Sequence, residues 1–106
     1  MKEKLPVILD VDTGIDDAVA IITACYQKQL DVQLITCCFG NTEQSHVVKN
    51  TITVLENINK QNIPVCPGAS APLGPEIDHV RAHGINGLGG YSKDISQRNA
   101  CLRFVL

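Results

Sequence analysis

Acidic side chains concentrate near the N-terminus of this 106-residue chain. Four of its 11 acidic residues fall within the eight positions DVDTGIDD, namely Asp10, Asp12, Asp16 and Asp17. Two carboxylates about 4 Å apart repel by about 4 kcal/mol at an effective dielectric near 20, so several such pairs beside an apolar core call for a counter-cation. Carboxylate oxygens suit Ca²⁺ or Mg²⁺, whereas zinc prefers His and Cys side chains, which this run lacks. The run therefore predicts a divalent-cation and substrate site.

The surrounding elements are those of a parallel α/β sheet. Strands are predicted at residues 6–11, 32–38 and 64–66, and helices at residues 16–29 and 43–59. Strand–helix–strand–helix–strand at these lengths implies a parallel sheet with right-handed crossovers. In such sheets ligands bind beyond the carboxyl ends of the strands, where the acidic run falls.

The two predicted helices differ in their patterns. The first is apolar nearly all round and is therefore expected to be buried. The second has a single apolar stripe and one solvated face. The stripe consists of Val47, Val48, Ile52, Leu55 and Ile58.

The predicted turn at Gly14 should fold the acidic residues together. Asp10 and Asp12 are two apart on a strand and share a face, while Asp16 and Asp17 open the following helix. Helix capping is the alternative for either residue of the second pair. That alternative does not account for Asp10 within an apolar strand.

Composition narrows the class of protein. A net charge of −2 without a clustered basic face argues against nucleic-acid binding. The apolar runs are too short for a membrane span, and the N-terminus does not have the pattern of a signal peptide. Five cysteines without CxxC spacing are interpreted as small buried hydrophobes in a reducing cytoplasm, with a zinc site or redox pair as the minor alternative.

Residues 67–97 are rich in Pro and Gly and predict a long functional or mobile loop. Its glycines could form a phosphate cradle, but no strand directly precedes them and no P-loop Lys-Ser/Thr follows. Residues 99–106 (NACLRFVL) look like the opening of another helix without a C-cap. The expectation is that the chain ends inside a larger fold.

Three ordered motifs resemble those of the nucleoside hydrolases, the inosine/uridine-preferring nucleoside N-ribohydrolases. They are LDVDTGIDDA at residues 9–18, FGN at residues 39–41 and HGINGLG at residues 83–89. The resemblance extends over essentially the whole chain. It implies that residues 1–106 are the N-terminal βαβαβ part of a single Rossmann-like nucleoside hydrolase domain, truncated before the C-terminal segments that complete the family's calcium shell.

The resemblance also implies roles for the acidic residues. Asp12 would be a calcium ligand and the general base that activates water, and Asp17 would be the second calcium ligand. Asp10 would support the geometry of the cluster.

Three further residues would contact the substrate by the same resemblance. Asp16 would hydrogen-bond a ribose hydroxyl, and Asn41 would orient the ribose or the attacking water. His83 would be a catalytic residue near the nucleobase, although a solvated loop histidine is the alternative from the residues alone.

The implied reaction is the Ca²⁺-assisted hydrolysis of a ribonucleoside to ribose and free base, as in purine and pyrimidine salvage. The family resemblance further implies a homo-oligomer, a dimer or tetramer, for the full-length form. The isolated chain is expected to be weakly active or inactive. The alternatives are a Mg²⁺-dependent phosphatase of the haloacid-dehalogenase type, whose D-x-D-G-T order differs at Thr13 and Gly14, and a non-catalytic metal-binding remnant.

Overall fold

The computed structural model of the chain describes residues 3–40, 42–69, 71, 74 and 86–91. Five elements follow one another in the predicted order. They are β1 (Leu5–Val11), α1 (Ile15–Tyr26), β2 (Leu30–Cys37), α2 (Gln44–Asn57) and β3 (Val65–Pro67). The α/β prediction is confirmed, and the predicted helices were too long by two residues for α1 and three residues for α2. The helix expected at residues 99–106 lies outside the described residues.

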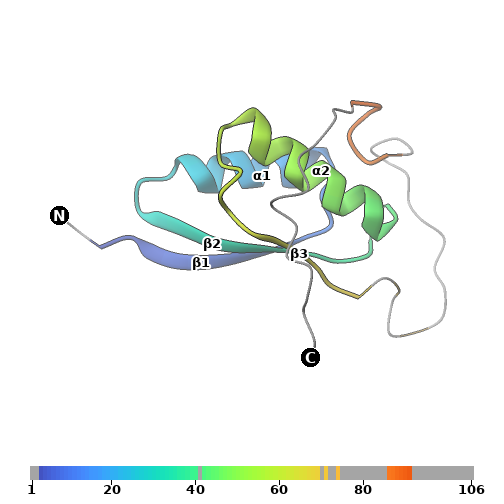
Figure 1. Cartoon of the computed structure of the whole chain (residues 1–106), viewed down its shortest axis with the longest axis horizontal. Coiled ribbons are helices and arrows are strands. Elements are labelled where there is room, and N and C mark those ends of the chain that lie inside the picture. The colour runs from blue at the N-terminus through green and yellow to red at the C-terminus, as the bar shows by residue number, and fades with distance from the viewer. Residues whose placement is uncertain (1–2, 41, 70, 72–73, 75–85, 92–106) are drawn as a thin grey trace.

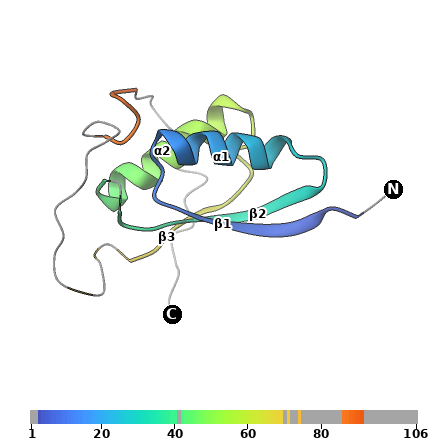
Figure 2. The same cartoon turned by 180° about the vertical axis from the view of Figure 1, so that it is seen from behind.

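The three strands form one parallel sheet in the order β1-β2-β3. Both helices lie on the same face of this sheet and contact each other (Figures 1 and 2). Two crossovers of the same hand that step in one direction across a parallel sheet place their helices on one face. Because the three strands are parallel, their carboxyl ends all lie at the same end of the sheet.

A bulge adjusts which side chains of β2 face the helices. The register pairs Val7 with Val32 but Ile8 with Leu34, which leaves one extra residue in β2. Val32 packs against the core and Ile35 is part of it, although the two are three positions apart. An extra residue restores the alternation that a regular strand would have lost.

The core lies between the sheet and the helices. Its fully buried large side chains come from every element except β1 and include Ile21, Ile35, Ile52 and Leu55. The expectation that α1 is buried all round is wrong for the described residues. Only Ile21 and Ala24 are buried in α1, whereas Val19 is 59% exposed, because the sheet and α2 lie on one side of this helix.

Helix α2 buries polar as well as apolar side chains. Val47, Ile52 and Leu55 of the predicted stripe are buried, and Val48 and Ile58 pack at its border. Asn50, Thr51 and Thr53 are also buried, which an apolar-stripe interpretation does not predict. The Thr53 hydroxyl donates to the Lys49 carbonyl oxygen at 2.7 Å, and the bonds of Asn50 and Thr51 are described below.

The helix ends follow ordinary rules. Helix α2 ends at Asn57 and is followed, after its C-cap Ile58, by Asn59 with positive φ. The Lys60 amide donates to the Leu55 carbonyl oxygen across this residue. Neither α1 nor α2 is long and apolar enough to cross a membrane, and these are the helices of the described residues.

Candidate functional site

The turn between β1 and α1 brings two of the predicted carboxylates together. The Asp12 backbone amide donates to Asp17 Oδ2 over 3.1 Å. The N-cap residue of α1 is Gly14, which makes no side-chain cap bond, and the Asp17 carboxylate accepts from the amide at the end of the strand. The helix N-terminus nevertheless favours negative charge at Asp16 and Asp17 in its first turn.

The environment of Asp17 raises the pKa of its carboxyl. The pKa of Asp17 is raised from 3.8 to about 6 by partial burial, by a side-chain hydrogen bond with Asp12 and by the negative charges of Asp12 and Asp16. The hydrogen bond from the Asp12 backbone amide acts in the opposite direction and lowers it. Repulsion between like charges has this effect wherever carboxylates share a site without a cation. The three side chains therefore form an electrostatically strained cluster.

Gly40, just after the end of β2, is packed against the Asp12 side chain. A Cβ atom at residue 40 would lie 2.6 Å from Asp12 Oδ2, 3.1 Å from its Cβ and 3.2 Å from its Cγ. No larger residue fits there without displacing the carboxylate. The glycine of the FGN motif thus allows the close approach of two strand ends.

Asp10 is held apart from the Asp12–Asp17 pair. It pairs in register with Thr36, is exposed on the sheet face away from the helices, and its Oδ1 accepts a 2.8 Å hydrogen bond from the Thr36 hydroxyl. Asp10 still acts electrostatically at this end of the sheet. Burial is the main cause that raises the pKa of the Cys38 thiol, and the negative charges of Asp10, Asp12 and Asp17 raise it further.

The cysteines behave mainly as neutral side chains. Cys37 and Cys66 are buried, Cys25 and Cys38 are half-buried, and all four are free thiols, while Cys101 lies outside the described residues. Burial raises the pKa of Cys37 to about 11, so this thiol stays protonated at neutral pH.

A complete metal shell is not assembled from the described residues. Within that part of the chain, no three side chains of His, Cys, Asp or Glu are grouped closely enough to hold a metal ion. Asp12 and Asp17 offer a pair of adjoining carboxylates. Such a pair fits part of the oxygen shell of a hard cation such as Ca²⁺.

A buried polar network joins the turn between β1 and α1 to helix α2. It was not predicted from the sequence. Thr13 is fully buried, and its hydroxyl lies 2.7 Å from that of Thr51, which also donates to the Val47 carbonyl oxygen. Asn50 is 3% exposed and donates to the Thr13 carbonyl oxygen over 3.1 Å. The only signal in the sequence was a pair of adjacent polar residues within the buried part of an amphipathic helix.

The turn at residues 86–91 is organised by one side chain. Asn86 Oδ1 accepts from the Leu88 amide at 3.1 Å and the Gly90 amide at 3.0 Å, and its Nδ2 donates to the Tyr91 carbonyl oxygen at 2.8 Å. The positive φ angles at residues 87, 89 and 90 explain why glycines occupy these three positions. In Figures 1 and 2 this turn, drawn in orange, lies at the end of the molecule where the strands finish.

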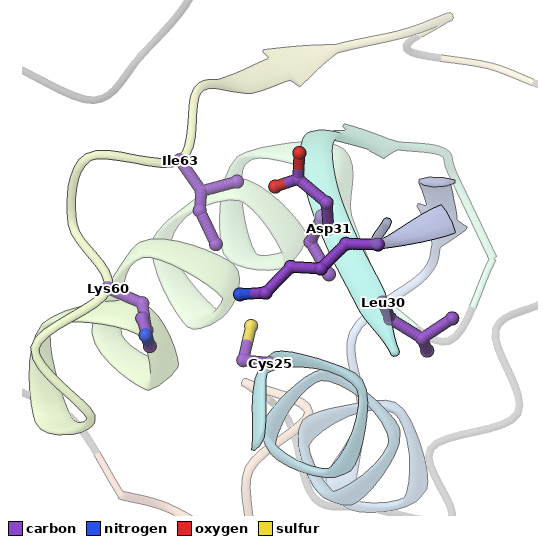
Figure 3. Close-up of a pocket in the computed structure, with 7 residues that line it drawn as sticks. Cys25, Leu30, Asp31, Lys60 and Ile63 are labelled. Atoms are coloured by element: carbon purple, nitrogen blue, oxygen red, sulfur yellow. The ribbon is translucent and has the colours of Figure 1, made fainter. Parts of the chain in front are cut away.

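Two predicted site residues, Asn41 and His83, lie outside the described residues. A cavity of about 140 Å³ occurs at the other end of the sheet, lined among others by Cys25, Leu30 and Lys60 (Figure 3). Leu30 opens β2 and Cys25 lies in the last turn of α1. This cavity is therefore remote from Asp12 and is not part of the acidic site.

Comparisons with known proteins agree on one family. The sequence profile described as inosine-uridine preferring nucleoside hydrolase matches residues 7–104. The chain is 42% identical over 89 residues to the non-specific ribonucleoside hydrolase RihC of Klebsiella pneumoniae, covering 83% of this chain and 29% of that protein. A RihC of Escherichia coli is also 42% identical, over 90 residues.

Solved structures give the same result. A plant nucleoside hydrolase, the PpNRh1 enzyme, superposes with a TM-score of 0.83 at 34% identity, covering 93% of this chain and 32% of that one. An inosine-guanosine nucleoside hydrolase superposes with a TM-score of 0.78 at 35% identity, covering 88% and 29%. The chain thus spans about three tenths of the length of the relatives that it matches.

Proposed function

The chain belongs to the inosine-uridine preferring nucleoside hydrolase family, and we propose that it takes part in the hydrolysis of ribonucleosides to ribose and free base. Membership rests on the match over residues 7–104. Activity is a proposal for this chain, because the relatives named as ribonucleoside hydrolases are more than three times longer than the segment they share with it.

One observation carries the proposal: the Asp12 and Asp17 carboxylates adjoin at the carboxyl end of β1. This edge is where open α/β sheets bind ligands. A buried network and a glycine contact hold the pair in place, although the closeness of the charges is unfavourable. A charge arrangement that is costly in the absence of a ligand, and is rigidly supported, suggests a binding site.

Ca²⁺ is the proposed cofactor. The paired oxygens of Asp12 and Asp17 suit a hard cation. Partial burial and then the neighbouring carboxylates raise the pKa of Asp17, and a bound cation would relieve the repulsion between these carboxylates. When bound, the ion would supply positive charge that lowers the pKa of water and helps to orient ribose hydroxyls. The described residues offer two ligands, so further oxygens must complete the shell.

The side chains of this chain then divide the remaining chemistry. Water attacks the anomeric carbon of the ribose, the N-glycosidic bond breaks, and the Asp12 carboxylate accepts the proton that the water loses. Positive charge develops on the ribose as the bond breaks, and the surrounding carboxylates favour it. Asp16 would bind a ribose hydroxyl, Asn41 would orient the ribose or the attacking water, and His83 would assist the departing base.

The wider setting of the activity is also proposed from the family resemblance. Ribonucleosides are the expected partners, and release of free bases suits purine and pyrimidine salvage in the cytoplasm. A dimer or tetramer is proposed for the assembled enzyme. Gel filtration coupled to light scattering would test the oligomeric state directly.

The test is release of ribose from inosine and uridine in the presence of calcium. Asp12→Asn should lower the rate by about 10²- to 10⁴-fold, because the amide cannot accept the proton. Asp31→Asn is the matched control, since Asp31 is an exposed carboxylate at the start of β2. Equal rates for the two variants would contradict the role of Asp12.

Calorimetric titration with Ca²⁺ accompanies the activity assay. Binding to the unaltered chain that is weakened in Asp12→Asn and Asp17→Asn supports the proposed metal ligands. Calcium-dependent stabilisation without ribose release would favour a non-catalytic metal-binding chain. Phosphate release from p-nitrophenyl phosphate with Mg²⁺ would favour a phosphatase.

A further inference from the structure

We propose that Asn50 of α2 is a positioning residue that links the carboxylate turn, residues 12–14, to the glycine turn, residues 86–91. Its Nδ2 donates to the Thr13 carbonyl oxygen at 3.1 Å and to the Asn86 carbonyl oxygen at 2.6 Å. The two acceptors lie 73 positions apart in the chain. The inference deepens the proposed function and rests on it for its catalytic consequence.

The chemistry of the side chain explains why an asparagine suits this position. An amide NH₂ has two hydrogens, and here each has a carbonyl oxygen to which it can be donated. Because both partners are carbonyl oxygens, only the NH₂ end of the amide can face them, which fixes its orientation. An Asp or Leu side chain of similar size supplies neither donor.

Burial makes the arrangement demanding. Asn50 is 3% exposed, so its removal leaves two carbonyl oxygens without the donor that now satisfies them. A buried polar group that loses its partner destabilises the conformation that buries it. The two hydrogen bonds therefore stabilise the conformation in which both turns contact Asn50.

The carboxylate turn includes Asp12 of the proposed site, and Asn50 bonds the glycine turn to it. Thr13 directly follows Asp12, and Thr51, the neighbour of Asn50, holds the Thr13 hydroxyl. Asn86 in turn fixes the amides of Leu88 and Gly90. Order in the glycine turn is thus transmitted through one side chain to the backbone that aims the Asp12 carboxylate. Such coupling between sites is reciprocal.

Amide hydrogen exchange measured by NMR tests this link without requiring turnover. Three amides are reporters: that of Asp12, bonded to Asp17, and those of Leu88 and Gly90, bonded to Asn86. In Asn50→Leu all three should exchange at least tenfold faster. The Ile35 amide, which donates to the Pro64 carbonyl oxygen in the sheet, should keep its rate.

Asn57→Leu is the matched control. Asn57 lies on the same helix and its amide also contacts the glycine-turn segment, through the Tyr91 hydroxyl at 3.3 Å, but it does not contact Thr13. The Asp12 amide should exchange at an unchanged rate in this variant. Faster exchange at Leu88 and Gly90 in Asn50→Leu, with the Asp12 rate unchanged, would show independent turns and overturn the proposal.

A second variant covers the case in which Asn50→Leu does not fold. Asn86→Ala removes the side-chain oxygen that accepts from the Leu88 and Gly90 amides in the glycine turn. It keeps the backbone carbonyl oxygen that accepts from Asn50. The proposal expects faster exchange of the distant Asp12 amide as well, and an unchanged Asp12 rate would refute it.

The catalytic consequence is measured separately. Asn50→Leu should weaken Ca²⁺ binding at least tenfold and lower kcat more than it raises KM, because the carboxylate pair is misaimed while the ribose contacts remain. Absence of ribose release from every variant would count against the proposed function alone. The exchange result would still decide the role of Asn50.

Discussion

Replacing Gly40 with alanine is a direct way to disturb the acidic site by one methyl group. The new Cβ would lie 3.1 Å and 3.2 Å from the Cβ and Cγ atoms of Asp12 and 2.6 Å from its Oδ2. Ordinary carbon–carbon contacts are about 3.5–4.0 Å, so the Asp12 side chain must retreat by about 0.3–0.9 Å. Rotation of the carboxylate relieves the shortest contact but not the one to Cβ, which is fixed to the backbone.

The expected cost follows from this shift. Overpacking typically costs about 1–3 kcal/mol. Because the carboxylate can rotate, we expect Gly40→Ala to cost about 1 kcal/mol, or about 4–8 °C in Tm for a domain of this size. The effect on the site should be larger. A misplacement approaching about 1 Å can cost about 10²-fold in rate, so we expect about a 10- to 100-fold loss in ribose release and a comparable loss of Ca²⁺ affinity.

Two other glycines provide controls for this experiment. A Cβ at Gly74 would meet no atom of the described residues within 4 Å, so Gly74→Ala should change neither stability nor calcium affinity. A Cβ at Gly68 would meet the Cys37 carbonyl oxygen at 3.0 Å, so Gly68→Ala should lower Tm without weakening calcium binding. Calcium titration followed by thermal unfolding distinguishes the three variants. Calcium affinity in Gly40→Ala equal to that in Gly74→Ala would refute the proposed dependence of the site on this contact.

Two further predictions concern charge and burial at the same turn. The pKa of Asp17 is raised from 3.8 to about 6, so the folded calcium-free chain binds this proton more tightly than the unfolded chain does. The protonated Asp17 therefore contributes stability that is fully present below pH 3.8 and is lost as the pH rises through about 6. Urea unfolding between pH 3.5 and 7 should show this decline in the wild type relative to Asp17→Asn, and parallel curves for the two proteins would contradict the assignment. Thr51→Val should cost about 1–3 kcal/mol in urea unfolding, because the Thr13 hydroxyl loses this partner in a fully buried place. The Thr13→Val/Thr51→Val double variant should lose less than the sum of the single losses, and strict additivity would show that the two hydroxyls do not interact.

Local patterns were sufficient for most of the fold. β-branched runs, helix periodicity and turn residues identified all five elements in order, because each of these signals acts between residues close in the chain. The bounds moved by a few residues at most elements. The burial of α1 was overestimated, since apolar residues on every side of a helix do not reveal how many neighbours the helix has.

The acidic site was predicted in part. The short spacing from Asp12 to Asp17 was enough to indicate that these residues would meet at the turn. The hydrogen bond from the Asp12 backbone amide to the Asp17 carboxylate is consistent with this prediction. The separation of Asp10, which Thr36 of the next strand binds, depends on the strand register. The proposed roles of Asn41 and His83 stay predictions.

The sequence by itself determined the family, the order of the elements and the position of the carboxylates, because these depend on residue types and short spacings. Only the tertiary structure revealed the contacts that hold the carboxylates, from Gly40, Thr51 and Asn50. These residues contact the turn across 28 to 38 positions of sequence, and their types alone would suit a loop, a helix face or a core equally well. The acidic run thus contains the chemistry, whereas its geometry is set by parallel strands and a neighbouring helix that bring distant residues beneath it.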